Sequence, residues 1–231
     1  MLYSKYCISG VMPDVPNVPV LPDNPNDNIG DGTNIPSQFK EKTLMCTYNI
    51  NTTGDTILYK YFPEKETYIE KIIYNGEEIT PHSAYTSTNM WTNNRYCLYN
   101  FNKMGDIKIE YVLKENTTSM NYVYFGDTKI TEITIPSCIT TIQDDFYGGK
   151  IFDYYKGNAV YLTKIISLNK IAPSLEGSIL SIGSFGDSMD VYQRGTLYVP
   201  KDCAINYASW MGSEISSGLS RLGWLIKELD Y

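Results

Sequence analysis

Three short apolar runs recur at a fixed spacing in the C-terminal half of the chain. They are ITEITI at 130–135, LTKIISL at 162–168 and GTLYVP at 195–200. Aligning Ile133, Ile165 and Leu197 gives 165 − 133 = 32 and 197 − 165 = 32. Each run has the pattern of a short strand, whose apolar surface is too small to form a core alone. A fixed period of about 20–50 residues predicts a solenoid, in which each unit buries its apolar face against its neighbours.

Alternating runs of another kind fill residues 43–113. They are TLMCTYNIN at 43–51, TILYKYF at 56–62, YIEKIIY at 68–74, RYCLYNF at 95–101 and DIKIEYVL at 106–113. Asn75–Gly76 follows the third run, and both residues tolerate the positive φ of a two-residue turn, so a hairpin is expected there. The last two runs are predicted to pair with each other across residues 102–105. About six short strands in this stretch predict a small antiparallel β-sandwich over residues 43–115.

Two helices are predicted to close the C-terminal end. Lys201–Asp202 offers an N-cap to the first, and LSRLGWLIKEL at 219–229 forms the second. Their apolar residues recur at helical spacing, namely Ala204, Ile205, Ala208, Trp210 and Met211 in the first and Leu222, Leu225, Ile226 and Leu229 in the second. A solenoid needs an atypical last unit to cover the open end of its core. Residues 125–231 are therefore assigned to one repeat domain with a helical cap.

The first 36 residues differ from the rest of the chain. Prolines stand at every third position from 13 to 25, and polyproline II has three residues per turn, so their rings line one edge of an extended rod. Two interpretations stay open: a semi-rigid linker, or a ligand for a groove in a partner. In both, residues 1–36 form an arm outside the globular body. Its candidate anchor residues are Leu2, Tyr6, Ile8, Pro13, Pro16, Pro19 and Pro22.

Composition supports a β-rich fold and excludes some partners. Tyrosine occurs 21 times, and Tyr, Ile and Thr are favoured on the half-buried surfaces of sheets. The net charge is −7 and no cluster of Lys and Arg stands out, which argues against nucleic acid and against a polybasic membrane contact. No apolar run reaches the roughly 18–20 residues that cross a bilayer, and the first residues form a poor secretory signal. We expect a chain that is made and kept without export.

Few residues are suited to chemistry. The five cysteines are widely spaced and never in a CxxC pair, which predicts reduced and mostly buried thiols. His82 is the only histidine, so neither a histidine metal site nor a Ser-His-Asp triad has a second candidate. Asp144 and Asp145 are read as a solvated turn, because adjacent strand residues point to opposite faces. We expect no catalytic residues, no cofactor and no metal, and hence a protein that is not an enzyme.

The best candidate for binding is the segment at 85–99, YTSTNMWTNNRYCLY, which mixes aromatic rings with amide and guanidinium donors. Such a mixture suits contact with a sugar or a protein at low entropic cost. Alternatively, the segment is a long loop whose rings pack on the body or on a neighbouring copy. The Tyr-rich segment at 153–161 poses the same alternatives. The candidate interaction surface comprises Tyr85, Trp91, Asn94, Arg95, Tyr96, Tyr154 and Tyr155.

Several motifs resemble those of BspA-like leucine-rich-repeat proteins. ITEITIPSCITTIQDDFY at 130–147 is similar to the family's repeat, LTKIISLNKIAPSL at 162–175 to its final unit, and GTLYVPKDCAINYASW at 195–210 to its closing strand and helix. CTYNINTTGDT, EKIIYNGEEIT and YNFNKMGDIKIEYVL follow the order of a segment that opens many members. The resemblance covers about residues 43–231. It departs from the family in having one ordinary repeat, Tyr-rich insertions and an insertion at 210–222 before Trp224.

The resemblance implies a mainly β protein: a small antiparallel β-sandwich followed by a short leucine-rich-repeat solenoid with a C-terminal helical cap. The family is known mostly from surface adhesins of Bacteroidales and some protists, and from virion proteins of phages that infect Bacteroidales. Because the chain opens with a proline arm and no export signal, we expect a structural virion protein, either a head fibre or a capsid or tail decoration. The arm would bind a capsid or tail protein.

The body would project from the virion surface as a homo-oligomer, a trimer or dimer, and display a module for host-surface glycans. The alternative is a bacterial cell-surface adhesin or ligand-binding module.

Overall fold

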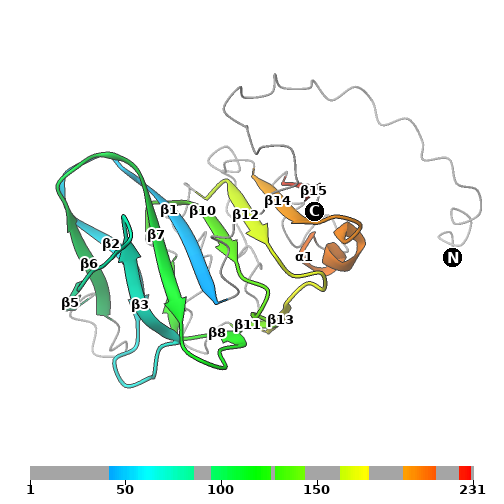
Figure 1. Cartoon of the computed structure of the whole chain (residues 1–231), viewed down its shortest axis with the longest axis horizontal. Coiled ribbons are helices and arrows are strands. Elements are labelled where there is room, and N and C mark those ends of the chain that lie inside the picture. Colours follow the sequence, from blue (N-terminus) through cyan, green and yellow to red (C-terminus); the bar gives the residue numbers. More distant parts are fainter. Residues whose placement is uncertain are drawn as a thin grey trace, which may run out of the picture. The chain divides into compact units, whose positions relative to one another are not determined.

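Short β-strands make up most of the structure, a computed structural model that describes residues 42–85, 95–125, 128–143, 162–176, 195–211 and 224–229. The strands are β1 (Thr43–Ile50), β2 (Gly54–Tyr61), β3 (Ile69–Tyr74), β4 (Glu77–Glu78), β5 (His82–Tyr85), β6 (Arg95–Phe101), β7 (Gly105–Leu113), β8 (Ser119–Met120), β9 (Val123–Tyr124), β10 (Ile130–Ile135), β11 (Thr141–Gln143), β12 (Lys164–Ser167), β13 (Ser174–Glu176), β14 (Thr196–Pro200) and β15 (Leu225–Leu229). The two short helices are η3 (Ala204–Tyr207) and α1 (Ala208–Met211) (Figure 1). The predicted mainly β fold is confirmed.

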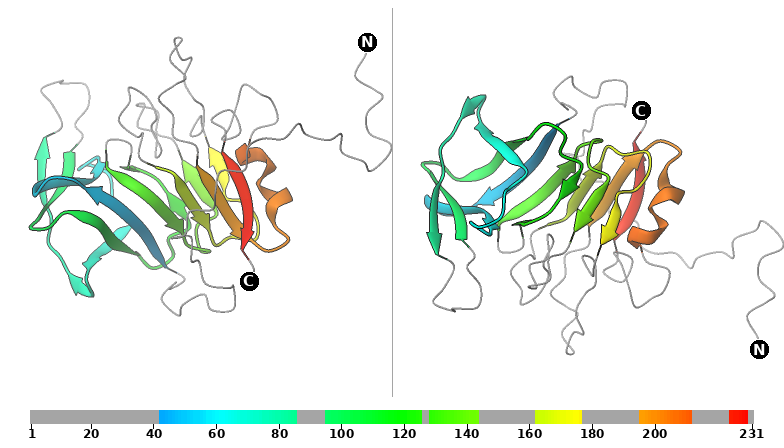
Figure 2. Two further views of the ribbon diagram at one scale, coloured as in Figure 1. Left: turned by 90° about the horizontal axis from the view of Figure 1, so that it is seen from above. Right: turned by 90° about the horizontal axis from the view of Figure 1, so that it is seen from below.

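All of these elements belong to one compact unit, Gly32–Tyr231, whose largest sheet has eight strands in the order β15-β14-β12-β10-β1-β7-β3-β4. β1 pairs antiparallel with both β7 and β10. From β10 onward the strands run parallel and lie side by side (Figure 2). The chain therefore builds one uninterrupted sheet out of an antiparallel half and a parallel half.

The parallel half has the register that the 32-residue spacing predicts. Ile133 is paired with Ile165, and Ile165 with Leu197, while β15 adds Ile226 beside Leu197. Ile133, Ile165 and Leu197 are fully buried. Equivalent positions in successive strands thus form one apolar row. In this row, each buried side chain packs against the equivalent side chain of the strand before it.

Two smaller sheets complete the described structure. One has three short parallel strands, in the order β13-β11-β8. The other has four antiparallel strands, in the order β5-β6-β2-β9. Buried residues of all three sheets belong to one large apolar cluster, so a common core joins them.

Hydrogen-bonded tyrosines link the antiparallel half of the large sheet to the four-stranded sheet. Tyr48 donates from its hydroxyl to the carbonyl oxygen of Leu58 at 2.7 Å, and its oxygen lies 2.6 Å from that of Tyr111. Since the single Tyr48 hydrogen is used toward Leu58, Tyr111 is the donor between the two hydroxyls. Both rings are fully buried, and burial raises the pKa of each well above its usual value. These hydroxyls stay protonated and serve as structural hydrogen-bonding groups.

The predicted turn at Asn75–Gly76 is present, and both of its residues have positive φ, 53° and 82°. It joins β3 to β4, which pair antiparallel. The second predicted hairpin is wrong. β6 pairs with β2 and β5, whereas β7 pairs with β1 and β3, so the chain changes sheet across residues 102–104. The alternation of apolar residues does not show whether β6 and β7 pair with each other or lie in different sheets, because both strands bury one face in the same core.

The predicted second C-terminal helix is also wrong. Residues 225–229 form β15, which pairs in parallel with β14 along its whole length. Leu225 is 60 % exposed, so the apolar residues that fitted a helical face do not share a buried side. Pairing with β14 satisfies the backbone of this segment, and that tertiary gain overrides a weak local pattern.

The first C-terminal helix is present but short, and it begins differently from the prediction. Cys203 is the N-cap of η3 and makes no capping hydrogen bond from its side chain, while Asp202 has φ 60°. Trp210 is fully buried, and its Nε1 donates to the carbonyl oxygen of Pro173 at 2.9 Å. The helical segment is therefore attached to the parallel strands by its aromatic side chains.

Tyr207 makes a second buried attachment. Its hydroxyl donates to the carbonyl oxygen of Asn169 at 2.7 Å and lies 2.6 Å from Ser167 Oγ. Asn169 in turn donates from Nδ2 to the carbonyl oxygen of Pro136 at 3.1 Å. This network connects β10, β12 and η3 at the ends of the strands where backbone ladders stop.

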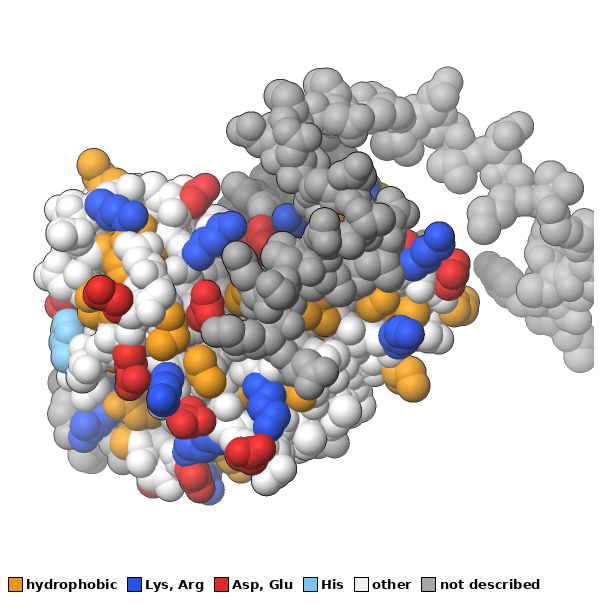
Figure 3. Space-filling model, in the orientation of Figure 1, with side chains coloured by type: hydrophobic (Ala, Val, Ile, Leu, Met, Phe, Trp, Pro, Cys, Tyr) orange, Lys and Arg blue, Asp and Glu red, His pale blue; other side chains and the backbone are white. Residues whose placement is uncertain are grey.

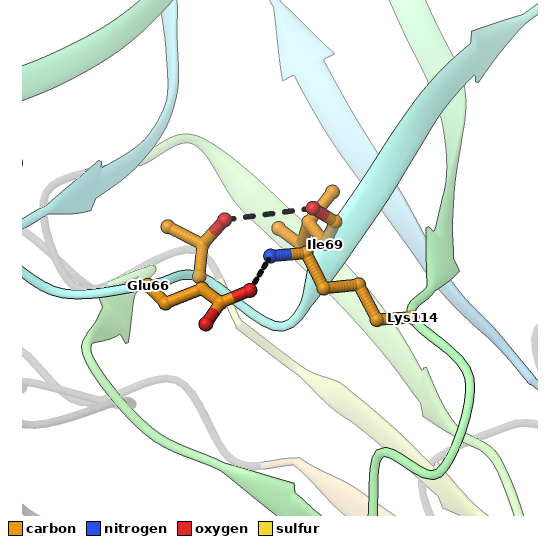
Figure 4. Close-up of polar contacts among 4 residues, drawn as sticks. Glu66, Ile69 and Lys114 are labelled. Atoms are coloured by element: carbon orange, nitrogen blue, oxygen red, sulfur yellow. Dashed lines mark hydrogen bonds and ion pairs between the residues drawn. The ribbon is translucent and has the colours of Figure 1, made fainter.

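Ion pairs on the surface join strand ends. Lys114, directly after β7, lies 2.8 Å from Glu66, which precedes β3 (Figure 4). Lys42 forms a similar pair with Glu115 at 2.9 Å. The hydrogen bond and the charge of each lysine lower the pKa of its glutamate. Both glutamates are more than 80 % exposed, so solvent screens these pairs and they contribute little to stability.

Candidate interaction surface

Two predicted surface residues, Arg95 and Tyr96, begin β6 in the four-stranded sheet. Arg95 is the backbone partner of Tyr85 at the end of β5, and Tyr96 is the partner of Ala84. The antiparallel pairing therefore brings Tyr85 and Arg95 together. Trp91, Asn94, Tyr154 and Tyr155 lie outside the described residues, as do the anchor residues Leu2, Tyr6, Ile8, Pro13, Pro16, Pro19 and Pro22.

Tyr96 lies on the outer face of the four-stranded sheet with its ring half-buried. The ammonium group of Lys60, on the neighbouring β2, is 5.5 Å from the centre of this ring. Such a cation–π contact holds the flat ring in place at a partly exposed site. Over the described part of the face drawn in Figure 3, acidic and basic side chains are interspersed with apolar ones.

An exposed hydrogen-bonded pair, His82 and Asp55, crosses β6. His82 Nε2 lies 3.2 Å from Asp55 Oδ2, and both side chains are about half exposed, 54 % and 50 %. His82 is the backbone partner of Leu98, and Asp55 of Asn100. The pair therefore spans from β5 to β2 over the middle strand. The sequence marked His82 only as the single histidine and gave no sign of this partner.

A cavity of about 250 Å³ opens beside β5, and we call it the β5 pocket. It is lined by Tyr59, Tyr61, Ile72, Pro81, His82, Ser83 and Cys97. Cys97 follows Tyr96 on β6, and consecutive strand residues point to opposite faces. The β5 pocket and Tyr96 therefore lie on the two sides of the same strand.

The floor of the β5 pocket is buried, and its hydroxyl and thiol groups are not activated for chemistry. The Tyr59 hydroxyl and the Cys97 sulfur share a hydrogen bond. Burial raises the pKa of the Cys97 thiol to about 11, so it carries no thiolate near neutral pH. The Tyr59 hydroxyl is likewise held protonated, because burial raises its pKa. These groups can donate and accept hydrogen bonds but are not activated as nucleophiles or bases.

Within the described ranges, no three His, Cys, Asp or Glu residues gather closely enough to hold a metal ion. The same part of the chain has no helix that is long and apolar enough to span a membrane. The described cysteines Cys46, Cys97, Cys138 and Cys203 form no disulfide bond.

The sequence missed most of the β5 pocket. Tyr59 and Tyr61 were read only as part of an alternating strand, and alternation does indicate that both point to one side. The contribution of Ile72 and Pro81 could not be foreseen, because it depends on how β3 lies against the four-stranded sheet. Comparison of this chain with known protein families, curated proteins and solved structures gives no match.

Proposed function

We propose that this protein is a BspA-like leucine-rich-repeat protein that serves as a non-enzymatic structural component of a phage virion. In this proposal, residues 1–36 bind a capsid or tail protein, and the rest of the chain projects outward as a homo-oligomer. The projecting body displays a surface for host glycans.

The register of the parallel strands carries the proposal. Ile133, Ile165 and Leu197 are paired in successive strands, so the 32-residue spacing corresponds to one strand per unit of a repeat. We interpret β10 to β15 with the three-stranded sheet as a short leucine-rich-repeat solenoid. The four-stranded sheet and the antiparallel half of the large sheet are interpreted as the β-sandwich that precedes it. Repeat scaffolds of this kind commonly present extended binding surfaces.

The chemistry of the body fits binding better than catalysis. Its buried tyrosines and cysteines, among them Tyr48, Tyr111 and Cys97, have their pKa values raised by burial and remain protonated. A catalytic residue needs a pKa near the working pH and access to a substrate. By contrast, the half-buried Tyr96 ring beside Lys60 is the kind of rigid amphipathic group that contacts sugars and proteins.

Deleting residues 1–36 tests the anchoring step. The shortened chain should keep the far-UV circular dichroism of the full chain, because the first described strand, β1, begins only at Thr43. It should fail to co-sediment with phage particles made in cells that express it. The matched control is the full chain with Tyr96→Ala, which should enter particles normally.

Two results would count against this function. Incorporation of the shortened chain at the level of the full chain would remove the anchoring role of the arm. Recovery of the full chain in the cell envelope, and never in particles, would instead indicate the cell-surface adhesin.

A further inference from the structure

The β5 pocket combines a buried floor with an exposed rim. Tyr59, Ile72 and Cys97 are buried and form the floor. Ser83 and His82 are exposed and form part of the rim. A ligand in the pocket would therefore rest on preformed, rigid groups and meet adaptable polar groups at the entrance. This is the usual arrangement of a small-molecule site.

Hydroxyl groups and the imidazole of His82 supply the polar part of the β5 pocket lining. None of its seven described lining residues is a Lys, Arg, Asp or Glu, and the imidazole of His82 is paired with Asp55. An anion would need cationic groups here, and a metal cation would need carboxylates. A purely apolar ligand would leave the hydroxyl groups of Ser83 and Tyr61 without partners. The lining thus selects a neutral ligand with hydroxyl groups, which can both donate and accept.

The aromatic part of the lining indicates a ring. The Tyr59 and Tyr61 rings meet edge to face, with their centres 5.9 Å apart, so they hold each other in position. Tyr61 is half-buried and offers an aromatic surface next to its polar hydroxyl. A pyranose has C–H groups on one face and hydroxyls around its edge, which matches this combination. The volume of about 250 Å³ lies just below the usual range for drug-sized ligands, roughly 300–1,000 Å³, and suits a single ring.

We propose that the β5 pocket binds the terminal, uncharged sugar residue of a glycan. This assignment rests on the proposed function, because it names the part of the displayed body that would contact host glycans. It differs from the sequence-based candidate surface, because the described members of that surface, Tyr85, Arg95 and Tyr96, are not among the lining residues of the pocket.

Saturation-transfer difference NMR on the full chain provides the test. The probes are methyl glycosides of glucose, galactose, mannose and N-acetylglucosamine, which stand for the terminal residue of a glycan. The corresponding free sugars stand for a soluble monosaccharide, and N-acetylneuraminic acid serves as an anionic probe. At least one methyl glycoside should bind with a dissociation constant in the millimolar range, and the anionic sugar should not bind.

Two tryptophan variants locate the binding. Ser83→Trp places a large ring at the rim of the β5 pocket and should weaken binding by about tenfold or more. Ala84→Trp is the matched control, because the next residue on β5 points to the opposite face and should leave binding within about twofold. Both variants should keep the circular dichroism of the parent chain, since residues 83 and 84 are not buried.

Three outcomes would overturn the assignment. The first is that no methyl glycoside binds, and the second is that only the free sugars bind. The third is that the Ser83→Trp and Ala84→Trp variants lose the same amount of binding affinity. If glycosides do not bind but the full chain still enters particles, the pocket assignment fails and the virion role stands. If glycosides bind and particles contain none of the chain, the virion role fails instead.

Discussion

The hydroxyl of Tyr207 connects separate segments of the parallel half. It contacts Ser167 and the carbonyl oxygen of Asn169, and Asn169 extends the network to Pro136. Ser167, Asn169 and Tyr207 are all buried, so water cannot replace a lost partner without opening the core.

Tyr207→Phe should therefore lower the free energy of unfolding by about 1–3 kcal/mol, because it leaves a buried carbonyl and a buried hydroxyl short of a partner. Urea denaturation of the purified chain measures the change. Tyr96→Phe is the control, since Tyr96 lies on an exposed sheet face and its variant should match the parent. Equal stability of the Tyr207→Phe variant and the parent would show that the network does not stabilise the fold.

At the scale of elements, strands and their faces were the predictable part. The sequence placed β6 at its observed bounds, and the alternation of Ile107, Ile109 and Tyr111 matches the buried face of β7. Local backbone preferences determine where strands form. They also determine the turn at Asn75–Gly76, because both of its residues tolerate positive φ.

The partners of the strands were less predictable. β6 and β7 are neighbours in sequence but lie in different sheets, and residues 225–229 fit a helix by pattern yet form a strand. Both outcomes depend on which distant segment provides the backbone hydrogen bonds of the strand. The alternation of residues along a strand does not indicate which segment will be its partner. The candidate site shows the same limit. The sequence pointed to Arg95 and Tyr96, whereas the β5 pocket forms only where β2, β3, β5, β6 and the loop at Pro81 meet.

The junction of β14 and β15 depends on one glycine. A Cβ added at Gly195 would lie 2.4 Å from the ring of Trp224, closer than atoms can approach. Trp224 is only 3 % exposed, so its ring has no open space to move into. Gly195 is therefore required by the close contact between the two strand starts.

Gly195→Ala should lower the free energy of unfolding by about 1–3 kcal/mol through overpacking. Thermal unfolding would record a fall of about 2–4 °C for each kcal/mol in a chain of this size. A double-mutant cycle with Trp224→Leu supplies the control, because the smaller side chain removes the clash. The combined variant should be more stable than the sum of the two single changes. Strict additivity would argue against the contact as the cause.

At the scale of the whole molecule, the uninterrupted eight-stranded sheet is the main feature. β1 belongs to both halves, since it pairs with β7 on one side and with β10 on the other. The predicted boundary between a domain at 43–115 and one at 125–231 stays a prediction, and this shared strand bears on how independently the two could fold.

We expect one cooperative unfolding transition for the described body. Trp210 and Trp224 report on the parallel half, whereas far-UV circular dichroism reports on all strands. In a Trp91→Phe background, the two signals should change at the same urea concentration, as two-state behaviour requires. Two separate midpoints would show instead that the predicted domains unfold independently.

The position of β1 also has a mechanical consequence. Lys42 leads directly into β1, so tension transmitted along the chain from the residues before it enters the body through this strand. The ladder bonds of antiparallel pairs run perpendicular to the strands, so a pull along β1 loads its bonds to β7 and β10 in shear. Bonds loaded in shear share the force and break together, whereas bonds at a peeled edge break one at a time. The chain thus enters its body through a strand that is hydrogen-bonded on both sides.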